Sequence, residues 1–190
     1  MKHYPEGIIG VDEVGRGCLA GPLVVGAVRL TEPIPGLKDS KLLSPKKRNY
    51  FNELIIATAD FVGLGWVSAQ EIDKLGLSKA LSLAGERALS GLKTDYASIV
   101  LDGAYNYLNQ FDRVETVIKA DLTIAAVSAA SIVAKVARDK YMIELAQSIK
   151  GYGFERNVGY GSAEHLQAIN KLGVCNQHRR SFEPIKSMTA

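Results

Sequence analysis

The sequence is poor in cysteine and has no long apolar run. Its two cysteines, Cys18 and Cys175, are too few for a disulfide framework and lack the spacing of a zinc site. A reducing compartment fits this usage best, so we expect a cytoplasmic location. The most apolar helix-like stretch, 122–134, is shorter than the roughly 20 residues that span a bilayer. No signal-peptide core follows the first residues, and we expect no membrane association.

The sequence also has little excess of one sign of charge over the other. The 190 residues carry a formal net charge of +3, and 47% of them are hydrophobic, which is typical of an ordinary globular protein. This length predicts a single domain, 1–190, and a monomer is the default expectation. Basic residues do gather within 36–48, where five Lys or Arg accompany one acid. Such a cluster is usually solvated surface and sometimes a rim that faces phosphates.

Hydrophobic periodicity and turn residues predict the order of strands and helices. We expect strands at 8–11, 23–30, 61–67, 98–101 and 114–118. We expect helices at 45–59, 69–75, 78–92, 124–149 and 163–172, and a glycine-rich loop at 151–161. The early strands read as a meander and the later ones alternate with helices. The pattern therefore predicts an α/β fold with a mixed β-sheet flanked by α-helices and a helical C-terminal part.

The first strand ends in two adjacent carboxylates, Asp12 and Glu13, followed by a glycine-rich turn. Neighbouring side chains of a strand point to opposite faces, so both can serve one site only if the strand twists or ends there. A hairpin turn with surface acids is the ordinary interpretation. Arg16 between Gly15 and Gly17 favours a binding site instead, because a guanidinium on uncovered backbone is a good phosphate ligand.

Two further aspartates follow later strands. Asp102 ends the strand at 98–101, and Asp121 lies just after the strand at 114–118. Sites in α/β sheets gather where strands end, and carboxylates converging there repel one another unless a cation is bound. Hard oxygen ligands suit Mg²⁺ or Mn²⁺. Taken singly, Asp102 could belong to an Asp-Gly turn and Asp121 could lie near a helix N-terminus.

Several blocks of the sequence closely resemble the ribonuclease HII family, the type 2 ribonucleases H. The first block is Asp12-Glu13-Val14-Gly15-Arg16-Gly17 with Leu19-Ala20-Gly21-Pro22. The others are Asp39-Ser40-Lys41-Leu42, Leu101-Asp102-Gly103, Lys119-Ala120-Asp121, 128–139, Gly159-Tyr160-Gly161-Ser162 with His165, and 178–186. Together they cover nearly the whole chain in family order, which is a highly specific signal.

The resemblance implies a ribonuclease H-like fold and an endoribonuclease that acts on RNA–DNA hybrids and on ribonucleotides embedded in duplex DNA. It implies that two divalent ions, Mn²⁺ or Mg²⁺, are held by a catalytic set of carboxylates, namely Asp12, Glu13, Asp102 and Asp121. Cleavage would leave a 3′-hydroxyl and a 5′-phosphate. The substrate contacts that it implies are Gly15, Arg16, Gly17, Ser40, Lys41, Tyr160, Arg179, Arg180 and Lys186.

The chain departs from the family pattern after Asp121, where Leu122-Thr123 replace the usual Ala-Lys. Any role of that lysine in tuning the metals or contacting phosphate is therefore in doubt. We expect His165 and His178 to be structural or surface residues. Two rival functions remain from the residues alone: another two-metal nuclease or strand transferase on the same fold, and a hybrid-binding module without catalysis.

Overall fold

A five-stranded mixed sheet forms the centre of the computed structural model, which describes residues 6–32, 34–37, 43–92 and 95–188. The strands are β1 (Ile9–Val14), β2 (Leu23–Leu30), β3 (Ala59–Val67), β4 (Ile99–Asp102) and β5 (Val114–Val117), in the order β3-β2-β1-β4-β5. β2 pairs antiparallel with both β1 and β3, whereas β1, β4 and β5 run parallel. The predicted mixed sheet, with its early strands paired as a meander, is confirmed.

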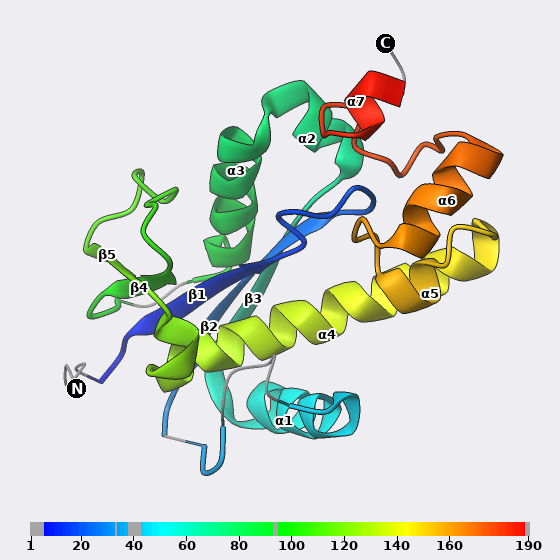
Figure 1. Cartoon of the computed structure of the whole chain (residues 1–190). Helices are drawn as coiled ribbons and strands as arrows, with labels where there is room; N and C mark the ends of the chain where they lie inside the picture. Colours follow the sequence, from blue (N-terminus) through cyan, green and yellow to red (C-terminus); the bar gives the residue numbers. More distant parts are fainter. Residues whose placement is uncertain (1–5, 33, 38–42, 93–94, 189–190) are drawn as a thin grey trace.

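Helices cover both faces of this sheet (Figure 1). α2 (Ala69–Leu75) and α3 (Leu77–Leu89) lie on one face; α4 (Ala125–Ser148) lies on the other, with α1 (Pro45–Thr58) packed beside it. α4 continues beyond the sheet, and the short helices α5 (Phe154–Asn157), α6 (Ala163–Leu172) and α7 (Ile185–Met188) gather around its far end and the neighbouring tip of the sheet. The α/β architecture with a helical C-terminal part is confirmed.

Local side-chain chemistry sets several helix ends. The Ser44 hydroxyl accepts a hydrogen bond from the main-chain N–H of Lys47, and Pro45 occupies the first turn of α1. Ser68 and Glu71 form a reciprocal capping box at the start of α2. Gly76 ends that helix with φ of 77°, a conformation that favours glycine.

Glycines bring both helical layers unusually close to the sheet. A Cβ at Gly10 would lie 2.1 Å from the carbonyl carbon of Ala126 in α4, and one at Gly26 would lie 2.5 Å from the Ala130 oxygen. On the other face, Gly63 and Gly65 leave the same kind of room for α3. The core helices therefore lie directly on the strand backbone, which fixes their position at the strand ends.

Two sequence predictions differ from the structure. β1 continues through both acids to Val14, because Glu13 and Val14 still pair with β2. The segment 151–161 was expected to be a loop, yet it contains α5. Gly153 at the N-terminal end of α5 and Val158 at its C-terminal end both adopt left-handed conformations, so this single helical turn has no amphipathic periodicity to reveal it.

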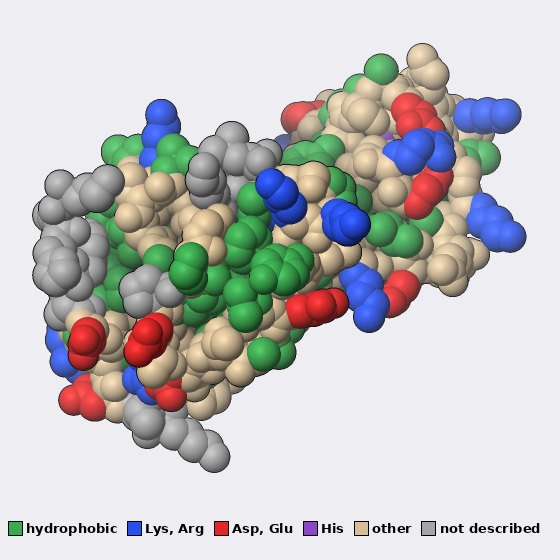
Figure 2. Space-filling view, turned by 90° about the horizontal axis from the view of Figure 1, so that it is seen from below, with side chains coloured by type: hydrophobic (Ala, Val, Ile, Leu, Met, Phe, Trp, Pro, Cys, Tyr) green, Lys and Arg blue, Asp and Glu red, His purple; other side chains and the backbone are tan. Residues whose placement is uncertain are grey.

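The surface is mixed in charge where Figure 2 shows it. On this face Lys and Arg side chains are interspersed with Asp and Glu, in keeping with the small net charge of the chain. Among the described residues, no helix combines the length and the apolar character needed to cross a membrane.

Candidate active site

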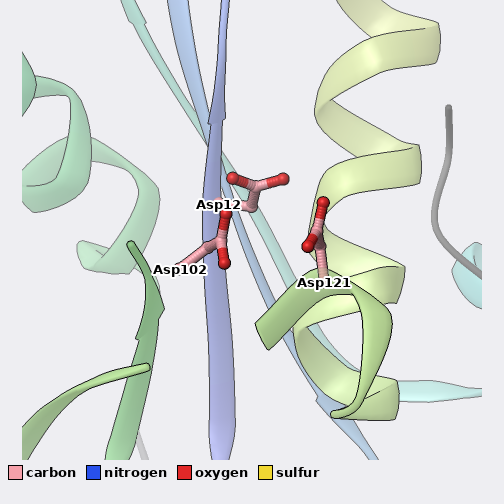
Figure 3. A group of neighbouring side chains, drawn as sticks. All are labelled: Asp12, Asp102 and Asp121. Atoms are coloured by element: carbon pink, nitrogen blue, oxygen red, sulfur yellow. The ribbon is translucent and has the colours of Figure 1, made fainter. Parts of the chain in front are cut away.

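Three aspartates from separate segments converge at the ends of β1 and β4. Each of Asp12, Asp102 and Asp121 offers a carboxylate oxygen, and these three oxygens lie within 4.8 Å of one another. Figure 3 shows the three side chains pointing toward a common space, Asp12 from β1, Asp102 from β4 and Asp121 from the turn that leads into α4. The chain folds this way because β1 and β4 are parallel neighbours whose carboxyl ends meet at one edge.

Short-range hydrogen bonds hold two of these segments together. The main-chain N–H of Ala120 donates to the Asp102 carboxylate at 2.7 Å. That bond joins the end of β4 to the 3-10 helix η2 (Ala120–Leu122), which carries Asp121. The hydroxyl of Ser128 on α4 donates to the main-chain oxygen of Asp121 and so ties η2 to the long helix.

Burial makes Asp12 an unusual carboxyl group. Its pKa is raised from the ordinary 3.8 to about 8, chiefly by burial and also by the nearby charges of Glu13 and Asp102. Hydrogen bonds from the Ser131 hydroxyl and the Glu13 main-chain N–H oppose this shift only in part. A carboxylate that is so costly to ionise in the apo protein calls for a positive charge beside it.

Glu13 is held on the other side of β1. Its carboxylate accepts a hydrogen bond from the hydroxyl of Tyr107 at 3.3 Å and lies 3.4 Å from the guanidinium of Arg16. Burial raises its pKa, and Arg16 lowers it. Tyr107 is packed in the core beneath α3, so its hydroxyl fixes Glu13 from that face. The structure thus brings three of the four predicted carboxylates together and keeps Glu13 as a neighbour of the cluster.

The glycine-rich loop after β1 presents its main chain to solvent. Arg16 and Gly17 are exposed, and a Cβ added at Gly17 would meet no atom within 4 Å. Within the described ranges, the main-chain N–H groups of residues 16 and 17 have no protein acceptor. The fold itself does not require glycine at position 17, so the open backbone is suited to close approach by a ligand.

Two fully buried arginines hold this loop and its neighbouring segments by hydrogen bonds to main-chain oxygens. Arg138 of α4 donates to the carbonyl oxygens of Pro22, Ala20 and Val158 at 2.8 to 3.2 Å. Arg179 donates to Gly21 O twice and to Arg16 O at 3.0 Å. Arg179 thus binds the carbonyl of Arg16 directly, whereas Arg138 holds the segments that follow and flank the loop.

The structure places Arg179, one of the expected substrate contacts, inside the protein. Its side chain is fully buried, and burial lowers its pKa to about 10, so it remains charged at neutral pH. Three of its donors are engaged by carbonyl oxygens. Direct contact with a substrate phosphate does not fit this burial, and Arg179 instead shapes the loop that carries Arg16.

Tyr160 stands at the edge of the same loop. The residue is 42% exposed, and its ring centroid lies 5.9 Å from the guanidinium carbon of Arg138. The preceding Gly159 has φ of 87°, and a Cβ there would lie 2.2 Å from the Ala20 oxygen. The Gly159 carbonyl accepts hydrogen bonds from Leu19 and Ala20, so the Tyr160 segment is fixed against the glycine-rich loop.

A pocket joins the strand end, the loop and Tyr160. It is lined by Asp12, Glu13, Val14, Gly15, Arg16, Gly17, Ser131, Lys135 and Tyr160. Sequence reasoning gave no role to Ser131 and Lys135, although their four-residue spacing on α4 places them on one helix face. The Lys135 ammonium lies 2.7 Å from the Asp139 carboxylate, which holds a cation on the pocket wall.

The remaining predicted contacts are spread over the surface. Arg180 and Lys186 are exposed near the C-terminal end, and the main-chain N–H of Arg180 donates to Asp73 of α2 at 2.8 Å. Ser40 and Lys41 lie outside the described residues. Neither Arg180 nor Lys186 lines the pocket, so any contact they make would be with a long substrate.

The donor set fits hard divalent cations. The three carboxylate oxygens are close enough to share one ion, and burial favours the protonated form of Asp12 when no metal is bound. Binding of Mg²⁺ or Mn²⁺ would offset the repulsion between these carboxylates. No cysteine or histidine belongs to this cluster, which excludes a soft-metal site from these residues.

Comparisons with known proteins agree with this geometry. The family model described as Ribonuclease HII matches residues 9–185. A ribonuclease HII of Roseobacter denitrificans is 45% identical over 95% of this chain and 92% of its own length. One from Acidovorax sp. (strain JS42) is 44% identical over 97% of this chain and 90% of its own. The crystal structure of ribonuclease H2 from Pyrococcus horikoshii superposes with a TM-score of 0.79 at 27% identity, covering 95% of this chain and 96% of that one.

Proposed function

The chain belongs to the ribonuclease HII family, and we propose that it is an endonuclease that cuts RNA–DNA hybrids and duplex DNA on the 5′ side of embedded ribonucleotides. The observation that carries this proposal is the cluster of Asp12, Asp102 and Asp121 beside an exposed glycine-rich loop. Metal-dependent hydrolysis of nucleic acid needs acidic ligands next to a surface that can accept a sugar-phosphate chain.

The three clustered aspartates would hold the ions, and Glu13 would complete the set from the other side of β1. Two bound divalent ions would supply an activated water and stabilise the leaving 3′ oxygen, so that the products carry a 3′-hydroxyl and a 5′-phosphate. Ala120 and Ser131 orient Asp102 and Asp12 by hydrogen bonds, which keeps the carboxylate oxygens aimed at one space.

The loop 15–17 would recognise the ribose. Its N–H groups at residues 16 and 17, which have no acceptor among the described residues, and its lack of side-chain cover at Gly17 would allow the main chain to reach a 2′-hydroxyl, the group that distinguishes RNA from DNA. The hydrogen bond from Arg179 to the Arg16 carbonyl would hold the loop in place for this contact. Lys135 and Arg16 would contribute positive charge for the backbone phosphates at the pocket.

Tyr160 would recognise the sugar that follows the ribonucleotide. Its partly exposed ring at the pocket rim would pack against a deoxyribose, and a 2′-hydroxyl there would crowd it. This arrangement would favour the junction at which RNA changes to DNA. The contribution of one packed ring should be on the order of 1–3 kcal/mol.

The direct test is cleavage of a labelled duplex containing one ribonucleotide, with and without Mn²⁺. We expect metal-dependent cutting 5′ of the ribonucleotide by the wild type, and none by Asp102→Asn. Asp112→Asn, which changes an exposed acid outside the cluster, is the matched control and should cut normally. Near wild-type turnover by Asp102→Asn would refute the assignment of the site.

Substrate preference needs a second comparison. Tyr160→Ala should lower kcat/KM on the single-ribonucleotide duplex more than on a uniform hybrid, and Tyr160→Phe should retain the preference because the ring face carries it. Equal losses on both substrates, together with a large drop in melting temperature, would show that Tyr160 serves packing alone.

A further inference from the structure

Two histidines lie buried behind Tyr160, in a part of the fold that the proposed chemistry does not use. His165 is in the first turn of α6, and His178 is in the segment that precedes α7. They are 0% and 2% exposed, and their Nε2 atoms are 3.1 Å apart. The rings of Tyr152 and Phe154 pack around the pair. Two imidazoles joined through the same type of nitrogen can form a hydrogen bond only if one donates and the other accepts.

The surrounding main chain fixes which histidine donates. The main-chain N–H of Cys175 donates to Nδ1 of His178 at 2.9 Å, so that nitrogen must be an acceptor. In the neutral imidazole the proton is then on Nε2 of His178, which donates to Nε2 of His165. The proton of His165 is therefore on its Nδ1, which donates to the carbonyl oxygen of Tyr160 at 2.8 Å.

Both rings must be neutral for this chain of bonds to exist. A proton added to His178 Nδ1 removes the acceptor for Cys175, and one added to His165 Nε2 places two donors face to face. Burial lowers the pKa of both histidines. The other titratable groups that face the pair are Glu164 of α6, the Cys175 thiol at 3.1 Å from Nδ1 of His178, and the Tyr152 hydroxyl, which donates to Gly173 O.

The pair connects two segments that both contact the glycine-rich loop. On one side, Gly159 O accepts from Leu19 and Ala20, directly before Tyr160. On the other side, Ala20 forms a β-bridge with His178, and the Arg179 N–H donates to Leu19 O. The hydrogen-bonded histidines join these two segments to each other, because His165 binds the carbonyl oxygen of Tyr160 and His178 binds His165.

We propose that His165 and His178 are positioning residues for substrate recognition: a neutral, one-directional hydrogen-bond relay from Cys175 N–H to Tyr160 O that sets the ring of Tyr160 against the substrate. The proposal rests on the proposed function of Tyr160. It assigns a role in specificity to two histidines that belong neither to the aspartate cluster nor to the lining of the pocket.

Two substitutions at one position separate the relay from simple packing. Asn at position 165 can place an amide N–H near the site of Nδ1 and keep the bond to Tyr160 O, whereas the longer Gln reaches only toward His178. We expect His165→Asn to stay within about twofold of the wild-type ratio of kcat/KM for the single-ribonucleotide duplex to that for the uniform hybrid. His165→Gln should lower this ratio about as far as Tyr160→Ala does.

The same substitutions in a Tyr160→Ala background provide the control. There, neither His165→Asn nor His165→Gln should change the ratio further, because the group that they position is gone. Equal effects of the two substitutions in the wild-type background, or a further loss caused by His165→Gln in the Tyr160→Ala background, would overturn the proposal.

A spectroscopic measurement tests the relay without substrate. In ¹⁵N spectra of the imidazoles of the metal-free wild type at pH 7, we expect His165 protonated on Nδ1 and His178 on Nε2. A charged ring at either position, or His165 protonated on Nε2, would overturn the relay even if the variants fail to fold. If Tyr160→Ala leaves the substrate ratio unchanged while both tautomers are as expected, the function proposed for Tyr160 fails and the relay itself stands.

Discussion

Replacing Asp12 by Asn should stabilise the protein in the absence of metal, and the gain should grow with pH. The carboxyl of Asp12 has its pKa raised to about 8 in the folded state, chiefly by burial, against 3.8 for an ordinary aspartate. When the pKa of an acid is higher in the folded than in the unfolded protein, the free energy of unfolding falls as the pH rises from the pKa of the unfolded state to that of the folded state. Asn has the same shape and does not ionise, so the variant escapes this loss.

The magnitude follows from the two pKa values. Each pKa unit corresponds to about 1.4 kcal/mol, so the wild type should lose about 2 kcal/mol at pH 5 and about 5 kcal/mol at pH 8 relative to a neutral side chain. The bond from the Glu13 N–H, 2.8 Å from one Asp12 oxygen, can be kept by the Asn carbonyl and contributes equally at both pH values. For a chain of this length, the difference of about 3 kcal/mol between the two pH values amounts to on the order of 10 °C in melting temperature.

The assay is thermal unfolding in a chelating buffer at pH 5 and pH 8, with Asp112→Asn as the exposed control. Asp12→Asn should melt higher than the wild type, by a wider margin at pH 8, and the control should match the wild type at both. Excess Mn²⁺ at pH 8 should then stabilise the wild type and leave Asp12→Asn nearly unchanged, because a ligand stabilises the state that binds it. A difference in melting temperature between Asp12→Asn and the wild type that does not change with pH would refute the electrostatic reasoning. Equal stabilisation of the two proteins by Mn²⁺ would show that Asp12 is not a ligand of the ion.

Three further results are expected. Gly15→Ala should lower the free energy of unfolding by about 1–3 kcal/mol, because the loop has φ of 83° there and the new Cβ would lie 2.2 Å from a buried guanidinium; Gly17→Ala should leave the melting temperature unchanged and lower kcat/KM, because only a ligand would meet its Cβ. In denaturant titrations, the free energy of unfolding of the wild type relative to that of His178→Gln should fall by about 3 kcal/mol as the pH drops from 6.5 to 4, because His178 has its pKa lowered to about 4 in the folded state. Arg180→Ala and Lys186→Ala should each reduce the slope of log binding constant against log salt concentration, measured with an RNA–DNA hybrid, by the equivalent of about one phosphate contact. An unchanged slope would show that the side chain does not reach a phosphate.

Much of the secondary structure could be predicted because its signals are local. The Ser44-Pro45 start of α1, the Ser68 capping box and the Gly76 stop each depend on residues within one helical turn. β2 has the predicted bounds, Leu23–Leu30, because its apolar run is enclosed by Pro22 and by a proline-containing loop. The family itself could be identified from the order of its motifs.

The site was predicted less completely, because its remaining features depend on contacts distant in sequence. The carboxylate of Glu13 accepts a hydrogen bond from Tyr107, which lies 94 residues further along the chain. Arg179 reads in the sequence as part of a basic tail, yet its guanidinium bonds to Gly21 O across 158 residues. A buried arginine that serves backbone carbonyls has no local signature, since its partners present no side chain to recognise.

The spacing of the clustered aspartates depends on a glycine, which has no functional side chain. Asp121 precedes α4, and α4 can reach β1 only because Gly10, two residues before Asp12, has no side chain: a Cβ there would lie 2.1 Å from the backbone of Ala126. Ser128, one turn along α4 from the start of the helix, then holds Asp121 through its main-chain oxygen. The distance between the carboxylates of Asp12 and Asp121 is thus governed by the contact of helix backbone with strand backbone. Close packing allows little adjustment there, so the oxygens can be held at cation spacing even though their charges repel one another.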